Sequence, residues 1–221
     1  KLKPEDVKPS SRQYPWIRFE FDDKDKLHRQ AVEVESLSFA YPASTRHIIN
    51  RLNLMINGGD RLAIIGENGV GKSTLLKLLM GEMQAQRGTI KWAEKARPAY
   101  YAQDHAQDFD SDRNLTEWIA GYARASAADG DDLETLIRGT LGRLLFSGNE
   151  VRKPVRVISG GEQGRMIFGK LMLMRANVLV MDEPTNHLDM ESIESLNTAL
   201  EKYRGTRSEE HTSELQSPCN L

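Results

Sequence analysis

The stretch GENGVGKST, residues 66–74, fits the pattern of Gly, four residues, Gly, Lys and then Ser or Thr. It follows RLAII at residues 61–65, a short β-branched run that predicts a buried parallel strand. It leads into residues 72–80, whose leucines predict a helix packed on that strand. A chance glycine-rich turn is the alternative, but the strand and the helix that the hypothesis requires are both present. The stretch therefore predicts a loop that cradles a polyphosphate.

The chemistry of this loop follows from its residue types. Glycines let the backbone N–H groups turn toward phosphate oxygens, and the positive end of the following helix favours the same anion. Lys72 is expected to reach the β- and γ-phosphates, and the Ser73 hydroxyl to ligate Mg²⁺. The residues expected to contact a nucleotide are Gly66, Glu67, Asn68, Gly69, Val70, Gly71, Lys72, Ser73 and Thr74.

The overall composition bounds the class of protein. The 221 residues are 39% hydrophobic, which suffices for a core, and a net charge of −2 gives no global reason to expect nucleic-acid or membrane binding. No apolar run approaches the roughly 20 residues that span a bilayer, which points to the cytoplasm. The only cysteine is Cys219, so neither a disulfide framework nor a cysteine-based zinc site is expected.

Along the chain, the patterns predict a linker, two strands and a helical insert. Residues 1–30 carry prolines, charges and an aromatic patch expected to dock onto something. Residues 32–37 and 48–56 alternate as strands do, whereas the interval from 81 to 98 is polar and turn-rich. Residues 113–150 look helical and amphipathic, with a break near 123–132.

A second set of polar residues follows the apolar run VLVM at 178–181, which predicts another strand. Asp182 and Glu183 come directly after it. A strand that ends in two carboxylates, downstream of a phosphate loop, is typical of a nucleotide triphosphatase. Asp182 is expected to hold Mg²⁺, usually through water, and Glu183 to accept a proton from the attacking water. An isolated Asp-Glu pair would more often be a helix cap or a surface charge.

Together, GENGVGKST, YAQD, ISGGEQ, VLVMDEP and TNHLD resemble the ATP-binding cassette domain from about residue 34 to residue 206. The resemblance implies an α/β phosphate-loop ATPase with a mixed sheet core, a small antiparallel β subdomain and an inserted helical subdomain at about 113–175. Residues 1–33 would be the remnant of an interdomain linker. Within the class, EPTNHLD and SGGEQGR resemble the F-type cassette proteins, which carry two cassettes on one chain and act on the ribosome in translation.

The resemblance also implies roles for single residues. Tyr41 matches the aromatic residue that stacks on adenine, although it could be an ordinary aromatic before a Pro turn. Gln103 matches the glutamine that senses Mg²⁺ and the γ-phosphate. Asp189 matches a loop that crosses to the partner cassette, a loop in which His187 is assigned no chemistry. The signature that closes over ATP held by a second cassette is matched by Ser159, Gly160, Gly161 and Glu162.

The resemblance ends near residue 206. The family continues with an apolar strand ending in Ser-His-Asp, whereas this chain reads RSEEHTSELQSPCNL from Arg207. We therefore expect no apolar strand there, nothing that fixes His211 near the phosphates, and no switch histidine. Residues 207–217 resemble a translated sequencing adapter, so residues 207–221 are expected to be a non-native tail, and Lys1 an internal residue.

The expected reaction is Mg²⁺-dependent ATP hydrolysis at two composite sites of a two-cassette parent, with a preference for ATP over GTP left open. A ribosome or rRNA partner rests on resemblance alone, and no transmembrane partner is expected. The nucleotide-binding subunit of a membrane transporter and a non-hydrolysing binding module are the rivals. A basic section in the helical insert is more often a solvated face than an RNA site; it comprises Arg138, Arg143, Arg152, Lys153 and Arg156.

Overall fold

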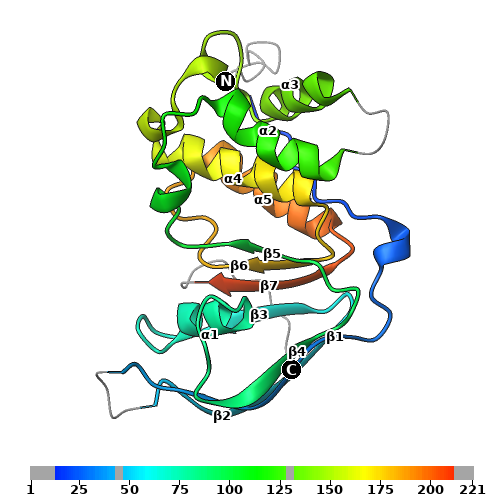
Figure 1. Cartoon of the computed structure of the whole chain (residues 1–221), viewed down its shortest axis with the longest axis vertical. Coiled ribbons are helices and arrows are strands. Elements are labelled where there is room, and N and C mark those ends of the chain that lie inside the picture. Colours follow the sequence, from blue (N-terminus) through cyan, green and yellow to red (C-terminus); the bar gives the residue numbers. More distant parts are fainter. Residues whose placement is uncertain (1–12, 43–46, 128–131, 212–221) are drawn as a thin grey trace, which may run out of the picture.

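The structure is a computed structural model that describes residues 13–42, 47–127 and 132–211, with the backbone alone at 209–211. Two sheets and a set of helices form stacked layers (Figure 1). The first sheet has the strand order β3-β7-β6-β5, and all its neighbouring strands are parallel. Its strands are β3 (Arg61–Ile65), β5 (Pro98–Tyr101), β6 (Val178–Met181) and β7 (Thr206–His211).

The second sheet is antiparallel and has the order β2-β1-β4. Its strands are β1 (Gln30–Phe39), β2 (Ile49–Asn57) and β4 (Arg87–Trp92). The sequence predicted β1 and β2 and indicated a polar, turn-rich interval where β4 lies. It did not identify β4, because this strand is held by its ladder to β1, with Val32 opposite Trp92 and Val34 opposite Ile90.

Five α-helices complete the described part of the chain. In Figure 1, α4 and α5 cover one side of the parallel sheet, α2 and α3 lie beyond α4, and α1 lies between the two sheets. The expected helical insert is therefore present. Every helix within the described ranges falls short of the length and apolar character that a bilayer span needs. The helices are α1 (Lys72–Leu79), α2 (Leu115–Ser126), α3 (Leu133–Arg143), α4 (Gly160–Met174) and α5 (Met190–Lys202).

Strand β6 joins two hydrophobic cores, because successive side chains of a strand point to opposite faces. Leu179 and Met181 pack with the core under α2 to α5, whereas Val178 and Val180 pack with the core of α1 and the antiparallel sheet. All four are buried. The strand that carries the acidic pair at its end is therefore fixed from both sides.

Strand β7 corrects an expectation about the end of the chain. A strand does form at Thr206–His211, although its sequence is polar, and it lies between β3 and β6. Its parallel register with β3 sets His211 opposite Ile65, the residue before the phosphate loop. The expectation that nothing would fix His211 near the phosphates is thus wrong for its backbone. Whether residues 207–211 belong to the natural protein stays a prediction.

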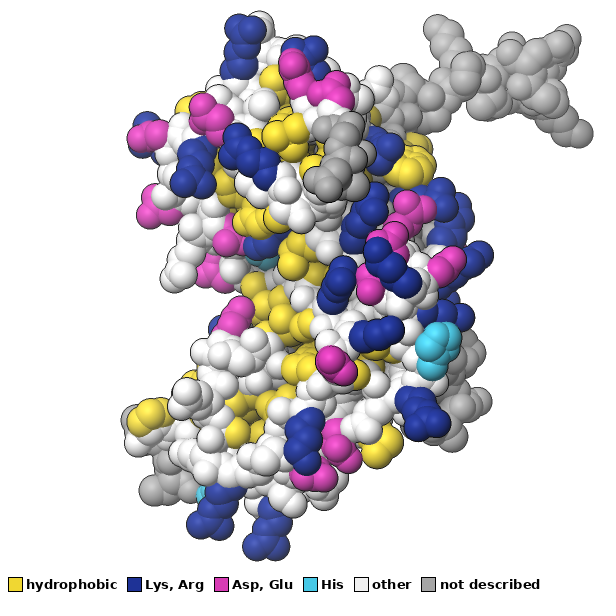
Figure 2. Space-filling model, turned by 45° about the vertical axis from the view of Figure 1, so that its right-hand side comes forward, with side chains coloured by type: hydrophobic (Ala, Val, Ile, Leu, Met, Phe, Trp, Pro, Cys, Tyr) yellow, Lys and Arg dark blue, Asp and Glu magenta, His cyan; other side chains and the backbone are white. Residues whose placement is uncertain are grey.

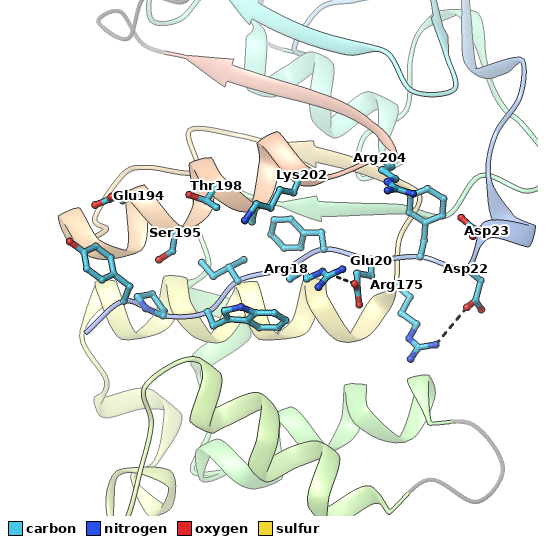
Figure 3. A pocket seen from close by; sticks show the side chains of 17 residues that line it. Arg18, Glu20, Asp22, Asp23, Arg175, Glu194, Ser195, Thr198, Lys202 and Arg204 are labelled. Atoms are coloured by element: carbon cyan, nitrogen blue, oxygen red, sulfur yellow. Dashed lines mark ion pairs between the residues drawn. The ribbon is translucent and has the colours of Figure 1, made fainter. Parts of the chain in front are cut away.

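The N-terminal aromatic section docks onto the helices (Figure 3). Ile17 and Phe19 are buried, and the Phe19 ring meets Phe168 of α4 at 6.5 Å and Tyr203, just after α5, at 6.3 Å. Trp16 lies under the Arg143 guanidinium at 4.7 Å. A surface cavity of about 1030 Å³ runs along this segment and α5. Residues 14–25 thus bind the helical layer from outside.

Candidate active site

The loop between β3 and α1 has the backbone that its glycines predict. Gly69 and Gly71 have φ values of 81° and 107°, a region that favours glycine. A Cβ atom on Gly71 would also lie 2.3 Å from Cγ2 of Ile48. Gly71 is the residue that precedes α1, so both its conformation and its crowding set how the chain enters that helix.

Lys72 is held inside this loop. Its side chain is buried, and its Nζ donates to the carbonyl oxygens of Gly66 at 2.8 Å and Glu67 at 3.2 Å. These bonds wrap the loop around the ammonium group. A polyphosphate that lies in the same loop would therefore meet a cation that is already placed.

The structure brings the loop together with the acidic pair. Ser73 Oγ donates to Asp182 Oδ1 at 3.2 Å, a contact across 109 positions of sequence. Asp182 is fully buried, and its other oxygen accepts from the Tyr100 hydroxyl at 3.4 Å. Sequence reasoning did not identify Tyr100, whose position in the strand before Gln103 was the available signal.

Ser73 and Asp182 suit Mg²⁺. Within the described residues, no group of three or more His, Cys, Asp or Glu side chains could hold a metal ion. Mg²⁺ needs no such group, because it keeps several waters and takes phosphate oxygens beside one or two protein ligands. A hydroxyl and a carboxylate oxygen 3.2 Å apart are oxygen donors of the kind it prefers.

Glu183 is held by two amides. Its Oε2 accepts from Nε2 of Gln103 at 2.9 Å and from Nδ2 of Asn186. Gln103 was expected near Mg²⁺; here its amide nitrogen is engaged by Glu183. The three side chains line a cavity of about 340 Å³, which also borders Gly160 and His187.

His105 lines the same cavity, and sequence reasoning missed it. Its ring meets Tyr101 edge-on at 4.5 Å. Burial lowers the pKa of His105 and the Lys170 charge acts the same way, whereas the carboxylates of Asp108 and Asp104 oppose them. The imidazole is therefore biased toward its neutral form.

The signature segment begins helix α4. Ser159 caps the helix by accepting from the Glu162 N–H, while the Glu162 carboxylate accepts from the Ser159 N–H at 2.7 Å. Burial alone would raise the pKa of Glu162. The hydrogen bonds from Ser159 and the Lys153 charge outweigh it and hold that pKa below its ordinary value. The Glu162 side chain is thus engaged by the cap.

The glycines of this segment lie beside the loop that follows β6. A Cβ atom on Gly160 would be 3.4 Å from Cβ of His187, and one on Gly161 would be 3.9 Å from Asp189 Oδ2. Asp189 itself caps α5 and accepts from the Ser192 N–H at 2.7 Å. Among the hydrogen bonds and ion pairs of the described residues, none joins 159–162 to the phosphate loop.

Tyr41 contacts the first turn of α1. Its hydroxyl is 3.0 Å from Oγ1 of Thr74, and its ring meets Phe39 edge-on at 5.1 Å. Tyr41 is 43% exposed. The structure therefore brings Tyr41 to the end of the phosphate loop, and its stacking on adenine stays a prediction.

Known proteins resemble the chain in sequence. The family model described as "ABC transporter" matches residues 49–186. The "Probable ATP-binding protein YbiT" of Escherichia coli O157:H7 is 54% identical over 206 residues, 93% of this chain and 37% of that protein. "ABC transporter F family member 5" of Arabidopsis thaliana is 36% identical over 200 residues, 90% of this chain and 28% of that protein. The chain thus spans only 37% and 28% of the length of these two curated relatives.

A solved structure resembles it in fold. The cbiO1 protein of Clostridium perfringens, described as part of the ABC transporter complex cbiONQ, aligns with a TM-score of 0.63 at 23% identity. The alignment covers 84% of this chain and 80% of that one. The expected α/β phosphate-loop ATPase fold is confirmed. Parallel and antiparallel pairs are both present, each in its own sheet.

Proposed function

The chain belongs to the ABC transporter family of ATP-binding domains, and on that premise we propose that it is an Mg²⁺-dependent ATP-hydrolysing cassette of a two-cassette, F-type protein. The Ser73–Asp182 contact carries the proposal, because it sets the phosphate loop against the acidic pair. The F-type assignment is supported by the Arabidopsis relative and by the EPTNHLD and SGGEQGR sequences.

In the proposed mechanism, the residues of this chain bind, orient and deprotonate. The amides of the 66–74 loop and Lys72 neutralise the phosphates, and Tyr41 stacks on the base. Ser73, Asp182 and Gln103 would hold Mg²⁺, and a bound Mg²⁺ would supply charge neutralisation at the phosphate oxygens. Glu183 accepts a proton from the attacking water. The carboxylate that does this lines the 340 Å³ cavity beside Gln103.

A second cassette completes each site in this proposal. Ser159, Gly160 and Gly161 start a helix whose N-terminal amides suit a phosphate. They make no hydrogen bond or ion pair with their own phosphate loop among the described residues, which supports a role in trans. Asp189 lies next to Gly161 and would cross to the partner. This chain alone is therefore expected to bind ATP and to hydrolyse it weakly or not at all.

A substitution of the proposed base tests the reaction. We expect Glu183→Gln in the two-cassette parent to keep ATP affinity and to lower phosphate release by about 10²- to 10⁴-fold, the usual worth of a general base. Glu194→Gln, an exposed carboxylate on α5, is the matched control and should change neither quantity. Unchanged turnover in Glu183→Gln would remove Glu183 from this role. Wild-type ATP binding without turnover would instead favour the non-hydrolysing module.

The ribosome is the proposed partner, on the strength of the F-type resemblance. The basic section of the helical insert adds little to this, since most of its cations have local partners. Arg156 pairs with Asp112 at 2.9 Å, Lys153 with Glu162 at 3.4 Å, and Arg138 with Glu134. On the face seen in Figure 2, Lys and Arg side chains are interspersed with Asp and Glu.

Cosedimentation with ribosomes tests the partner. The Glu183→Gln parent should pellet with ribosomes in Mg²⁺ and ATP, and should stay in the supernatant without nucleotide. Equal pelleting with and without ATP would contradict an ATP-gated interaction. Copurification with a transmembrane protein would revive the transporter alternative, which the F-type relatives do not favour.

A further inference from the structure

We propose that Asn186 is a positioning residue for the catalytic carboxylate. Together with Gln103 it forms an amide clamp, defined here as the Asn186 and Gln103 side-chain amides that hold Glu183. This inference rests on the proposed role of Glu183 as general base. It gives Asn186 a function that its place in the sequence motif did not indicate.

Two donors converge on one oxygen of Glu183. Gln103 Nε2 lies 2.9 Å from Oε2, and Asn186 Nδ2 donates to the same atom. Among the described contacts, Oε1 accepts no hydrogen bond, so one oxygen is held while the other stays available for a proton. Holding one oxygen from two directions restricts the rotation of the carboxylate, and a restricted orientation favours proton abstraction from a bound water.

The clamp draws on two separate parts of the fold. Gln103 follows β5, whereas Asn186 lies three residues after Glu183 in the loop that follows β6. The Asn186 backbone N–H also donates to the Glu183 carbonyl oxygen at 3.1 Å, which closes a turn. The side-chain bond spans this same turn. Asn186 therefore holds Glu183 from within the same loop, and Gln103 holds it from the segment that follows the neighbouring strand β5.

The backbone of Glu183 adopts an unusual conformation. Its φ is 47°, in the left-handed region that non-glycine residues seldom adopt. The Glu183 side chain lines the cavity of about 340 Å³ together with Gln103 and Asn186. Hydrogen bonds to a charged group are shorter and stronger than those between neutral groups, so the two amides restrain the orientation of the Glu183 carboxylate.

Side-chain amide NMR spectra test the clamp without any turnover. The NH₂ signals of Asn186 and Gln103 are identified by their loss in Asn186→Asp and Gln103→Glu. In the chain as it stands, Glu183→Ala should shift both NH₂ signals, whereas Glu194→Ala should shift neither. Signals of Asn186 that stay in place in Glu183→Ala would overturn the proposal.

Steady-state kinetics of the two-cassette parent test the consequence. We expect Asn186→Ala to lower kcat about tenfold, less than the loss of the base itself, with KM for ATP unchanged within about twofold. Asn186→Leu keeps a similar side-chain volume but loses the donors and adds no charge, so it should lower kcat at least as much. A packing role would spare Asn186→Leu. Asn197→Ala, on the exposed side of α5, is the control and should match the wild type.

Different results would contradict the positioning role of Asn186 and the proposed ATPase reaction. An Asn186→Ala protein with unchanged kcat would overturn the positioning role. A wild-type parent that binds ATP but never turns it over would refute the proposed reaction, and the amide signals would still decide whether the clamp exists.

Discussion

At the scale of single residues, the phosphate loop depends most on Gly71. Its φ of 107° is unfavourable for any other residue, and a methyl group there would collide with Ile48 Cγ2. Gly81 has a comparable φ of 75°, but no atom lies within 4 Å of the place where its Cβ would be. Alanine substitutions at Gly71 and Gly81 can therefore distinguish the effect of backbone strain from that of steric crowding.

We expect Gly71→Ala to lower the free energy of unfolding by about 1–3 kcal/mol and to weaken ATP binding, because both strain and a clash act at the loop. Gly81→Ala should show only the strain, about 1 kcal/mol, with ATP binding intact. Urea unfolding and the fluorescence of a labelled ATP measure the two effects. Equal losses in both variants would contradict a special role for Gly71.

At the scale of elements, α4 depends on its N-terminal cap. Ser159 and Glu162 satisfy each other's backbone N–H groups, and Lys153 lies 3.4 Å from the Glu162 carboxylate. The ionised form of Glu162 is the one that these contacts favour. Because the cap starts the signature helix, the stability of that helix is linked to pH.

The pKa of Glu162 is lowered in the folded chain, so the unfolded chain takes up its proton first as the pH falls. The stabilisation from Glu162 is therefore fully present above the ordinary glutamate pKa and is lost as the pH falls through the lower folded value. In thermal melts near pH 7, the wild type should have a higher Tm than Glu162→Gln. The difference in Tm between the two proteins should become smaller below about pH 4.5. A difference that is constant from pH 7 to pH 3 would contradict the linkage.

The polar strand β7 is the weak element of the parallel sheet. Strands that are covered on both faces are typically apolar, whereas β7 carries Ser208 in a buried position. The Ser208 hydroxyl is buried and has no hydrogen-bond partner in the structure. This mismatch agrees with the hypothesis of a non-native tail, which resequencing across the Thr206 codon would test.

Removal of that hydroxyl should stabilise the protein. We expect Ser208→Ala to raise the free energy of unfolding by about 1 kcal/mol, because a buried polar atom without a partner costs about 1–3 kcal/mol. Ser213→Ala, which lies outside the described residues, is a useful reference for a change in the tail. Chemical denaturation measures the difference, and a lower midpoint for Ser208→Ala would contradict the assignment.

At the scale of the whole molecule, residues 14–25 tie the layers together. Trp16 contacts Arg143 at the end of α3, and Phe19 packs on α4 and on the residue after α5. Asp25 contacts the residues that precede β5 and β6. Its carboxylate pairs with Arg97 at 3.2 Å, and its carbonyl oxygen accepts from Asn177 Nδ2 at 2.6 Å. The segment therefore contributes to the stability of the cassette.

We expect Phe19→Ala to lower the free energy of unfolding by about 3–5 kcal/mol, as for other large buried side chains. Tyr14→Ala should change it little, because Tyr14 is 44% exposed. Thermal melts of both variants provide the measurement. A single transition that shifts down in Phe19→Ala would show that the segment unfolds with the cassette, whereas an unshifted Tm would show that it is dispensable.

The sequence by itself determined the phosphate loop with its strand and helix, the strand that ends in Asp182 and Glu183, and the family. Each of these depends on local patterns of a few adjacent residues. The burial that it predicted for β3 was wrong, because β3 lies at the edge of the sheet and leaves Arg61, Ala63 and Ile65 exposed. Only the tertiary structure decided that β4 and β7 are strands, because polar segments acquire their conformation from the ladders they join. It also decided which side chains meet. Ser73 with Asp182 and Gln103 with Glu183 are far apart in sequence, and their pairing depends on the order of strands in the sheet.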